Sequence, residues 1–163
     1  MNRAERRRQQ KLARNTVKKS MPARSTSRSP KQRTSTLQND IDQASQHLTG
    51  GRLAEAERIY RQMLQDEPDQ PVALHMRGVI AHQAGKSDVA IDLITRALNV
   101  KADYAEARSN LGNILQSEGK LEEAVASYHK ALTIRPDFAD AYSNLGNALL
   151  RLGKNDEAVA SYR

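Results

Sequence analysis

The sequence, 163 residues long, has no cysteine and no apolar run long enough for a secretory signal or a membrane span. The lack of cysteine fits a reducing compartment, and we expect a cytoplasmic protein without a transmembrane segment. Acidic residues are nearly missing from one end, because residues 1–35 hold 12 lysines and arginines against one glutamate, a net charge of +11. The remainder has 14 basic and 18 acidic residues, a net charge of −4, so the overall value of +7 describes neither part.

This basic arm, residues 1–35, has few sizeable apolar side chains, namely Leu12, Val17 and Met21. Such a segment cannot bury enough surface to offset the entropy lost on ordering, so we predict that it is disordered. Three roles stay open: a solvated leader that aids solubility, an electrostatic attachment to RNA, ribosomes or anionic lipid, and a mitochondrial presequence. No aromatic residue stands among the basic ones, so base stacking is excluded and any nucleic-acid contact would ignore sequence.

Residue patterns typical of catalytic, metal or cofactor sites are also missing. The sequence has no glycine-rich phosphate loop after a strand and no Ser/His/Asp arrangement beyond chance. Its four histidines are isolated: His75 and His82 are seven apart and share one side of a predicted helix, but no carboxylate or cysteine joins them at ligand spacing. We therefore predict no catalytic residue, no metal and no cofactor in this chain. His75 and His82 are interpreted as solvated or as lining a partner-binding groove.

What the chain does contain is a repeat with a period of 34 residues. Residues 105–129 and 139–163 are identical at 16 of 25 positions, and a fixed period of this length indicates a stacked repeat array. The apolar residues of the first copy follow helical spacing. They are Leu111, Ile114 and Leu115, then Val125, Tyr128 and Leu132. Gly119-Lys120 marks a turn, so each copy is predicted to be a helix hairpin.

The same frame extends backward and gives the repeats 37–70, 71–104, 105–138 and an incomplete 139–163. The predicted helix pairs are 37–49/53–66, 71–84/87–100, 105–118/121–134 and 139–152/155–163. Aspartates recur at the junctions, where each is expected to cap the next first helix; they are Asp69, Asp103 and Asp137. Arg77 stands where later copies have Leu111 and Leu145, which should lower stability. Because the fourth copy stops short, we expect the front of a longer protein or a truncated product.

The repeats resemble the tetratricopeptide repeat. The residues that carry the resemblance are Leu111-Gly112, Ala124, Ala131 and Pro136, then Leu145-Gly146 and Ala158. In each copy the small residues let neighbouring helices approach closely, while Tyr128 and Tyr162 fill the space between helices. The resemblance implies an all-α fold, a right-handed superhelical solenoid of helix-turn-helix hairpins whose first helices line a concave groove. The disordered basic arm would precede this array, which spans residues 37–163.

Paired asparagines recur at the repeat period, Asn110 with Asn113 and Asn144 with Asn147. They either keep an open face soluble or pair with the backbone of an extended peptide, since an amide offers both donors and an acceptor. The segments SNLGN and EAVASY are similar to the repeats of O-linked N-acetylglucosamine transferases, whose asparagine ladder holds peptides. By matching positions, Asn110 and Asn144 would be the ladder residues here.

The ladder would begin only at the third repeat, because Met76 and Asp42 occupy the matching places earlier. The run AEAERIYRQML…ALHMRGVIAHQAG also looks like the opening repeats of bacterial Spindly-type glycosyltransferase homologues. A carboxylate clamp for chaperone tails is not expected, because Ser109 and Ser143 stand where that subfamily has lysine.

Three functions follow as hypotheses. The first is a scaffold that binds a protein or an extended peptide in the concave groove, with no catalysis in this chain. The second is a set of substrate-recruiting repeats from a longer or truncated O-linked N-acetylglucosamine transferase-like enzyme. The third is an adaptor held to RNA or an anionic surface by the basic arm.

Overall fold

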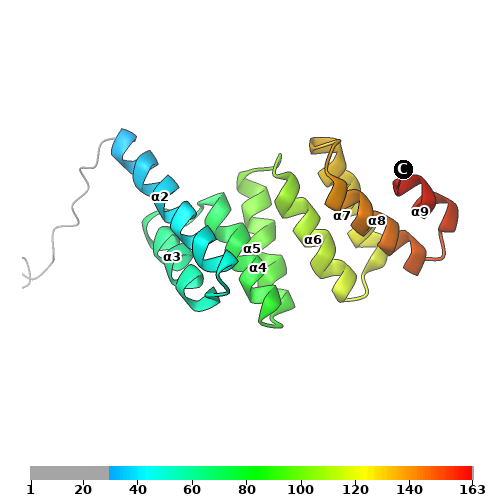
Figure 1. The fold of residues 1–163 in the computed structure, drawn as a ribbon, viewed down its shortest axis with the longest axis horizontal. Coiled ribbons are helices and arrows are strands. Elements are labelled where there is room, and N and C mark those ends of the chain that lie inside the picture. The colour runs from blue at the N-terminus through cyan, green and yellow to red at the C-terminus, as the bar shows by residue number, and fades with distance from the viewer. Residues whose placement is uncertain (1–29, 163) are drawn as a thin grey trace, which may run out of the picture. The chain divides into compact units, whose positions relative to one another are not determined.

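The computed structural model describes residues 30–162, which form eight α-helices joined by short turns (Figure 1). The helices are α2 (Pro30–Thr49), α3 (Leu53–Asp66), α4 (Pro71–Gln83), α5 (Ser87–Val100), α6 (Ala105–Ser117), α7 (Leu121–Ile134), α8 (Ala139–Arg151) and α9 (Asn155–Ser161). Within the described residues every regular element is a helix, so the predicted all-α hairpin array is confirmed. From α3 onward the predicted bounds hold to within two residues.

The first helix begins at Pro30, seven residues before the predicted start at 37. Proline suits the first helical position, because its missing N–H needs no partner there and its φ is already helical. The hydroxyl of Ser35 donates to the carbonyl oxygen of Gln32 at 3.1 Å, as in a helical turn. The prediction of disorder is therefore wrong for residues 30–35. For residues 1–29 that prediction lies outside the described residues.

Each hairpin turns at a glycine with a positive φ, as the Gly119-Lys120 pattern predicted. Gly119 has φ +77°, a conformation that only glycine adopts without strain. Its N–H donates to the carbonyl of Gln116 at 3.2 Å, and the N–H of Lys120 donates to that of Leu115 at 2.9 Å. These two bonds satisfy carbonyls that the end of α6 leaves open, and the same pair recurs at the other three turns.

The junction aspartates do not cap the first helices, so that prediction is wrong. They stand one residue too early, since the capping positions are Gln70, Tyr104 and Phe138. Only α4 of these three helices has a side-chain cap, in which Gln70 Oε1 accepts from the N–H of Ala73 at 2.6 Å. Tyrosine and phenylalanine offer no such acceptor close to the backbone, and α6 and α8 begin without one.

The two helices of a hairpin approach closely because a glycine of one faces a bulky residue of the other. A Cβ added to Gly112 would lie 2.5 Å from Cε1 of Tyr128, and one added to Gly78 would lie 2.5 Å from Cγ1 of Ile94. Tyr128 and Ile94 are fully buried. The predicted role of small residues in close helix packing is thus confirmed.

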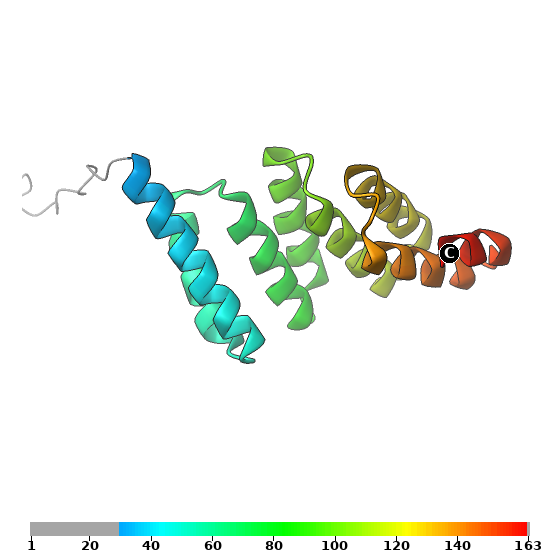
Figure 2. The ribbon, with the colours of Figure 1, turned by 45° about the horizontal axis from the view of Figure 1, so that its top comes forward.

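The first helices of successive hairpins also contact one another, α4 with α6 and α6 with α8. Among the described residues, the second helices of successive hairpins make fewer contacts with each other. A row of hairpins bends toward the layer whose members approach each other most closely. The side of α4, α6 and α8 along which they meet is called the inner face below. Figures 1 and 2 show the hairpins following one another in order within residues 36–162.

Candidate functional site on the inner face

The predicted asparagines come from two neighbouring helices that touch on the inner face. Asn110 and Asn113 lie on α6, while Asn144 and Asn147 lie one repeat later on α8. Because α6 and α8 are in contact, Asn144 reaches back across the junction, and its Nδ2 donates to Oδ1 of Asn113 at 3.0 Å. The three inner amides are partly buried and Asn147 is exposed. The expected alignment on one face is therefore found, with the rungs hydrogen-bonded to each other.

The hydrogen bonds continue to α4. Nδ2 of Asn113 lies 3.5 Å from Oδ1 of Asn110, the weakest contact of the series, and Nδ2 of Asn110 lies 2.8 Å from Nε2 of His75. Four side chains from three helices thus form one continuous row. This row of His75, Asn110, Asn113 and Asn144 is called the amide rail below.

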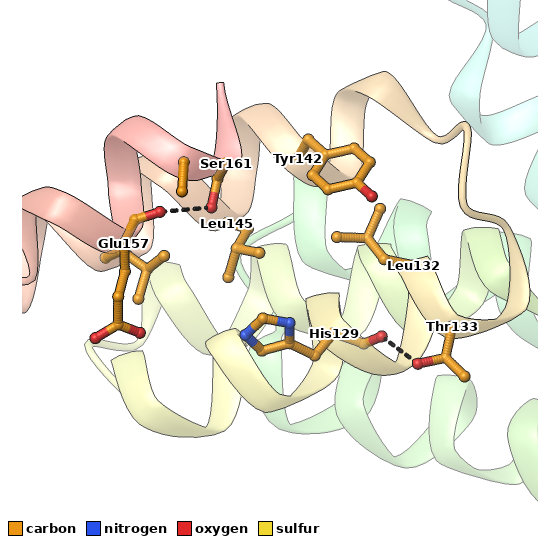
Figure 3. A pocket seen from close by; sticks show the side chains of 9 residues that line it. His129, Leu132, Thr133, Tyr142, Leu145, Glu157 and Ser161 are labelled. Atoms are coloured by element: carbon orange, nitrogen blue, oxygen red, sulfur yellow. Dashed lines mark hydrogen bonds between the residues drawn. The ribbon is translucent and has the colours of Figure 1, made fainter. Parts of the chain in front are cut away.

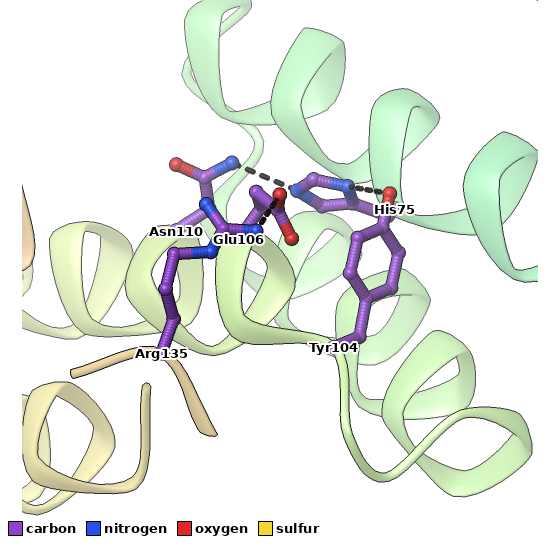
Figure 4. A network of polar contacts seen from close by, with 5 residues as sticks. All are labelled: His75, Tyr104, Glu106, Asn110 and Arg135. Atoms are coloured by element: carbon purple, nitrogen blue, oxygen red, sulfur yellow. Dashed lines mark hydrogen bonds and ion pairs between the residues drawn. The ribbon is translucent and has the colours of Figure 1, made fainter. Parts of the chain in front are cut away.

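His75 closes the rail at its α4 end (Figure 4). Its side chain is only 3% exposed, and Nδ1 lies 3.0 Å from the hydroxyl of Tyr104. The two rings meet edge to face with centroids 4.8 Å apart. Burial lowers the pKa of His75 to about 4, although the nearby Glu106 carboxylate opposes the shift. The imidazole is therefore neutral near pH 7, and burial raises the pKa of Tyr104 to about 12.

An ion pair lies beside this end of the rail. Arg135, which follows α7, donates to the carboxylate of Glu106 on α6 (Figure 4). Burial alone would raise the pKa of Glu106, but the hydrogen bond and charge of Arg135 hold it below its usual value. The guanidinium of Arg135 also lies 4.7 Å from the ring centroid of Phe138. Because Glu106 is paired, the rail offers a partner hydrogen bonds more than net charge.

A tyrosine fixes the middle of the rail from beneath. The hydroxyl of Tyr128 lies 2.8 Å from both Asn113 Oδ1 and Gln116 Oε1. Its ring is fully buried, which raises its pKa, so it stays a neutral donor. The arrangement partly recurs one repeat later, where the hydroxyl of Tyr162 donates to Asn147 Oδ1 at 2.7 Å. The core role predicted for Tyr128 is confirmed, but Tyr162 is 49% exposed and packs only on one side.

The structure thus brings together four of the six predicted site residues, His75, Asn110, Asn113 and Asn144. Asn147 is held separately by Tyr162. His82 does not join the rail, and its Nδ1 is buried without a hydrogen-bond partner among the described residues.

Sequence reasoning missed Tyr104, Glu106 and Arg135. The available signal was sequence separation, since the rail and ion-pair contacts that cross from one hairpin to the next join residues 29 to 35 apart. These separations lie close to the repeat period of 34, at which stacking brings side chains together.

A cavity of about 480 Å³ lies elsewhere, between α7, α8 and α9 (Figure 3). Its floor is apolar, with Leu132, Leu145 and Leu149, and none of the rail residues lines it. Two repeats earlier the matching space is filled, because Leu93 packs there in a buried cluster. Ser161 replaces that leucine at the cavity.

Two further findings concern the described residues alone. Among residues 30–162 no group of three or more His, Asp or Glu side chains lies where it could hold a metal ion. In the same part of the chain every helix is too short or too polar to cross a membrane.

Comparison with known families identifies the repeats. A model described as tetratricopeptide repeat matches residues 41–107, and one described as TPR repeat matches residues 112–153. None of the curated proteins matches the chain. Two separate models thus cover most of the array as tetratricopeptide repeats, and the predicted resemblance to this family is confirmed.

Several solved structures are similar to the chain. MamA is 25% identical over 77% of this chain and 68% of its own, with a TM-score of 0.68. The Thermobaculum terrenum O-GlcNAc transferase is 33% identical over 71% of this chain, with a TM-score of 0.69, but the match spans only 22% of that enzyme. The first TPR of Spaghetti (RPAP3), bound to an HSP90 peptide, is 24% identical over 69% of this chain and 89% of its own, with a TM-score of 0.64. The last of these shows the fold alone.

Proposed function

We propose, from the premise that this chain contains tetratricopeptide repeats, that it is a scaffold that binds an extended segment of a partner protein along its inner face. The observation that carries the proposal is the amide rail, in which four neutral side chains from three helices form one hydrogen-bonded row. No catalytic step is assigned to these residues. The expected groove, and a cytoplasmic location, stay predictions.

The rail suits a peptide backbone for a chemical reason. A carboxamide has two N–H donors and two acceptor lone pairs, and the contacts within the rail use only some of them. Backbone N–H and C=O groups are present in nearly every residue, so amides that bind them tolerate many sequences. An extended segment rises about 3.3 Å per residue, so it offers several such groups over the length of the rail.

Burial of His75 and pairing of Glu106 support the same proposal. Neither group leaves a free charge on the rail near pH 7, so a neutral backbone is a better match than a charged ligand. The first TPR of Spaghetti, a similar structure, is bound to an HSP90 peptide, and this supports the proposal. His82 is retained as a further contact of the proposed surface, because the residue is partly exposed on α4.

A second candidate function is recruitment of substrate for a glycosyltransferase. It is favoured by the 33% identity with the Thermobaculum terrenum O-GlcNAc transferase, over 71% of this chain. The two functions share the peptide-binding surface and differ in whether a catalytic domain accompanies it. Attachment to RNA or an anionic surface depends on residues 1–29, which lie outside the described residues.

The test uses a library of random linear peptides selected on the full chain. The affinity of a selected peptide is measured by titration for the wild type, for Asn110→Ala with Asn144→Ala, and for the control Asn99→Ala. Asn99 is an exposed residue of α5, away from the rail. Each lost amide contact costs roughly 0.5–1.5 kcal/mol, so the double variant should bind about 5- to 100-fold more weakly, with the control unchanged.

Equal affinity of the wild type and the double variant, at similar melting temperature, would overturn the proposal. The asparagines would then serve only to keep the inner face soluble, which is the other interpretation of their pattern.

A further inference from the structure

The hydrogen bonds of the amide rail all point in one direction. Asn144 donates to Asn113, Asn113 donates to Asn110, and the amide of Asn110 faces His75. Each amide group of the rail therefore has its N–H side turned toward α4 and its oxygen turned toward α8. Such a row needs a terminal acceptor at its α4 end, and that place is taken by His75.

The contacts of His75 determine which ring nitrogen carries the proton. Nδ2 of Asn110 has protons and no lone pair to offer, so Nε2 of His75, 2.8 Å away, must accept. The ring proton of the neutral imidazole then lies on Nδ1, which donates to the hydroxyl oxygen of Tyr104 at 3.0 Å. With the ring buried and both nitrogens engaged, His75 has no freedom to exchange the two roles.

We infer that His75 is a positioning residue that fixes the direction of the amide rail and thereby leaves Oδ1 of Asn144 as the acceptor open to a partner. This inference deepens the proposed function and rests on it. His75 touches no partner itself, because its side chain is only 3% exposed; it acts through Asn110.

The acceptors of the rail support this assignment. Oδ1 of Asn113 accepts from the Asn144 amide at 3.0 Å and also lies 2.8 Å from the Tyr128 hydroxyl, whose single proton it shares with Gln116 Oε1. This oxygen therefore already has two neighbours at hydrogen-bond distance. Oδ1 of Asn110 is contacted by the amide of Asn113. Among the described residues, Oδ1 of Asn144 has no donor. Asn144 therefore differs from the other two amides, although the sequence pattern treats Asn110 and Asn144 as equivalent.

The chemistry of the partner follows from this difference. At Asn144 it must present a donor, and in an extended segment that donor is a backbone N–H. Proline has no backbone N–H, and neither does an N-methylated residue, so neither should be accepted opposite Asn144. At Asn110 and Asn113 the partner is offered N–H groups and can meet them with its carbonyl oxygens.

The first arm of the experiment needs no partner and uses nitrogen NMR on the full chain. Long-range spectra of the imidazole should show the proton of His75 on Nδ1. In His75→Phe, which keeps a ring against Tyr104 but removes the acceptor, the side-chain amide signals of Asn110, Asn113 and Asn144 should shift and exchange faster. His75→Gln supplies an acceptor oxygen and should restore them.

A proton on Nε2, or amide signals of Asn144 that are the same in His75→Phe and wild type, would overturn the assigned direction. The spectra report on the side-chain amides of the rail and not on the stability of the fold. If His75 only filled space, His75→Gln would not return these amide signals to their wild-type positions. Melting curves of both variants show whether the fold is retained.

The second arm uses a peptide selected from the random library, with each backbone N–H methylated in turn. Methylation at one position should lower the affinity of the peptide for the wild type by roughly 2- to 10-fold. The Asn144→Ala variant should bind this methylated peptide and the unmethylated peptide equally well. The same position should still weaken binding to the control Asn99→Ala. If methylation lowers the affinity for Asn144→Ala by the same factors as for the wild type at every position, the inference is overturned. If the library yields no binder, the proposed function fails while the NMR arm still decides the direction of the rail.

Discussion

An ion pair at the first repeat junction occupies a place that is apolar at the later ones, and its replacement should stabilise the array. Nη2 of Arg77 on α4 lies 3.7 Å from Oε1 of Glu57 on α3. One repeat later Ile91 and Leu111 stand in these places, both packed against a buried apolar cluster. Arg77 is 27% exposed and its Nε is buried without a partner among the described residues. We predict that Arg77→Leu raises the free energy of unfolding.

The structure sets the size of the gain. A partly exposed ion pair at this distance contributes about 0–1 kcal/mol, and Glu57 keeps a closer partner in Arg61, at 2.9 Å. Glu57 therefore does not become a lone buried charge when Arg77 is removed. A buried unpaired N–H costs about 1–3 kcal/mol, and partial burial of a leucine contributes about 1 kcal/mol. Together these contributions amount to about 1–4 kcal/mol. The stem of Arg77 already buries part of the apolar surface that a leucine would bury, so we expect the lower end, about 1 kcal/mol, or about 3–5 °C in melting temperature.

The assay is thermal and urea unfolding followed by circular dichroism, with hydrogen exchange to locate the effect. In a repeat array each repeat contacts only its neighbours, so protection should rise more in α3 and α4 than in α8. The matched control is Arg96→Leu, which removes an exposed arginine 4.0 Å from Asp69 and should give no gain. A melting temperature of Arg77→Leu at or below that of the wild type would refute the reasoning.

Three other substitutions or conditions test the packing around the rail. Ile94→Tyr places a hydroxyl near the unpartnered Nδ1 of His82, as Tyr128 does for Gln116 one repeat later. It should raise the unfolding free energy by about 1 kcal/mol, and a lower midpoint would contradict this. Gly112→Ala puts a methyl group 2.5 Å from Tyr128 and should lower stability by about 1–3 kcal/mol in denaturant titration. The pKa of His75 is about 4 in the folded chain, against an ordinary value of 6.5, so between these pH values the unfolded chain binds one more proton than the folded chain. The free energy of unfolding should therefore fall by up to about 3 kcal/mol as the pH drops from 6.5 to 4. His75→Gln should lack this loss.

The sequence predicted the helices well because two local signals agreed with the repeat period. Glycines at the hairpin turns, such as Gly119, fixed where first helices end, and apolar spacing fixed which faces are buried. The predicted start of α2 is seven residues late, because the prediction treats residues 1–35 as one segment by composition, although Pro30 is a favourable first helical residue. The capping prediction failed by one residue at Asp103, since spacing alone does not show where the backbone turns helical.

The candidate site was predicted in part for a similar reason. Periodicity identifies residues that recur, so it found the asparagines of α6 and α8. It does not identify residues whose identity changes between copies, as at Tyr104, Glu106 and Arg135. The matching residues of the neighbouring copies are Phe138, Asp140 and Lys101. The repeat period brings the site residues near each other across a junction, but their contacts also depend on side-chain rotamers, which no spacing rule supplies.

The break in the asparagine pattern at α4 explains why the rail ends where it does. Met76 occupies the place of Asn110 in the preceding repeat, and a thioether offers no strong donor or acceptor to continue the row. His75, one residue earlier, supplies the acceptor instead, but from a buried position. The rail is therefore closed at α4 and open at α8, so hydrogen-bonding contacts with a partner should begin at α6 and extend toward α8. Methionine is a flexible apolar side chain, and at α4 it can offer a partner only apolar contact.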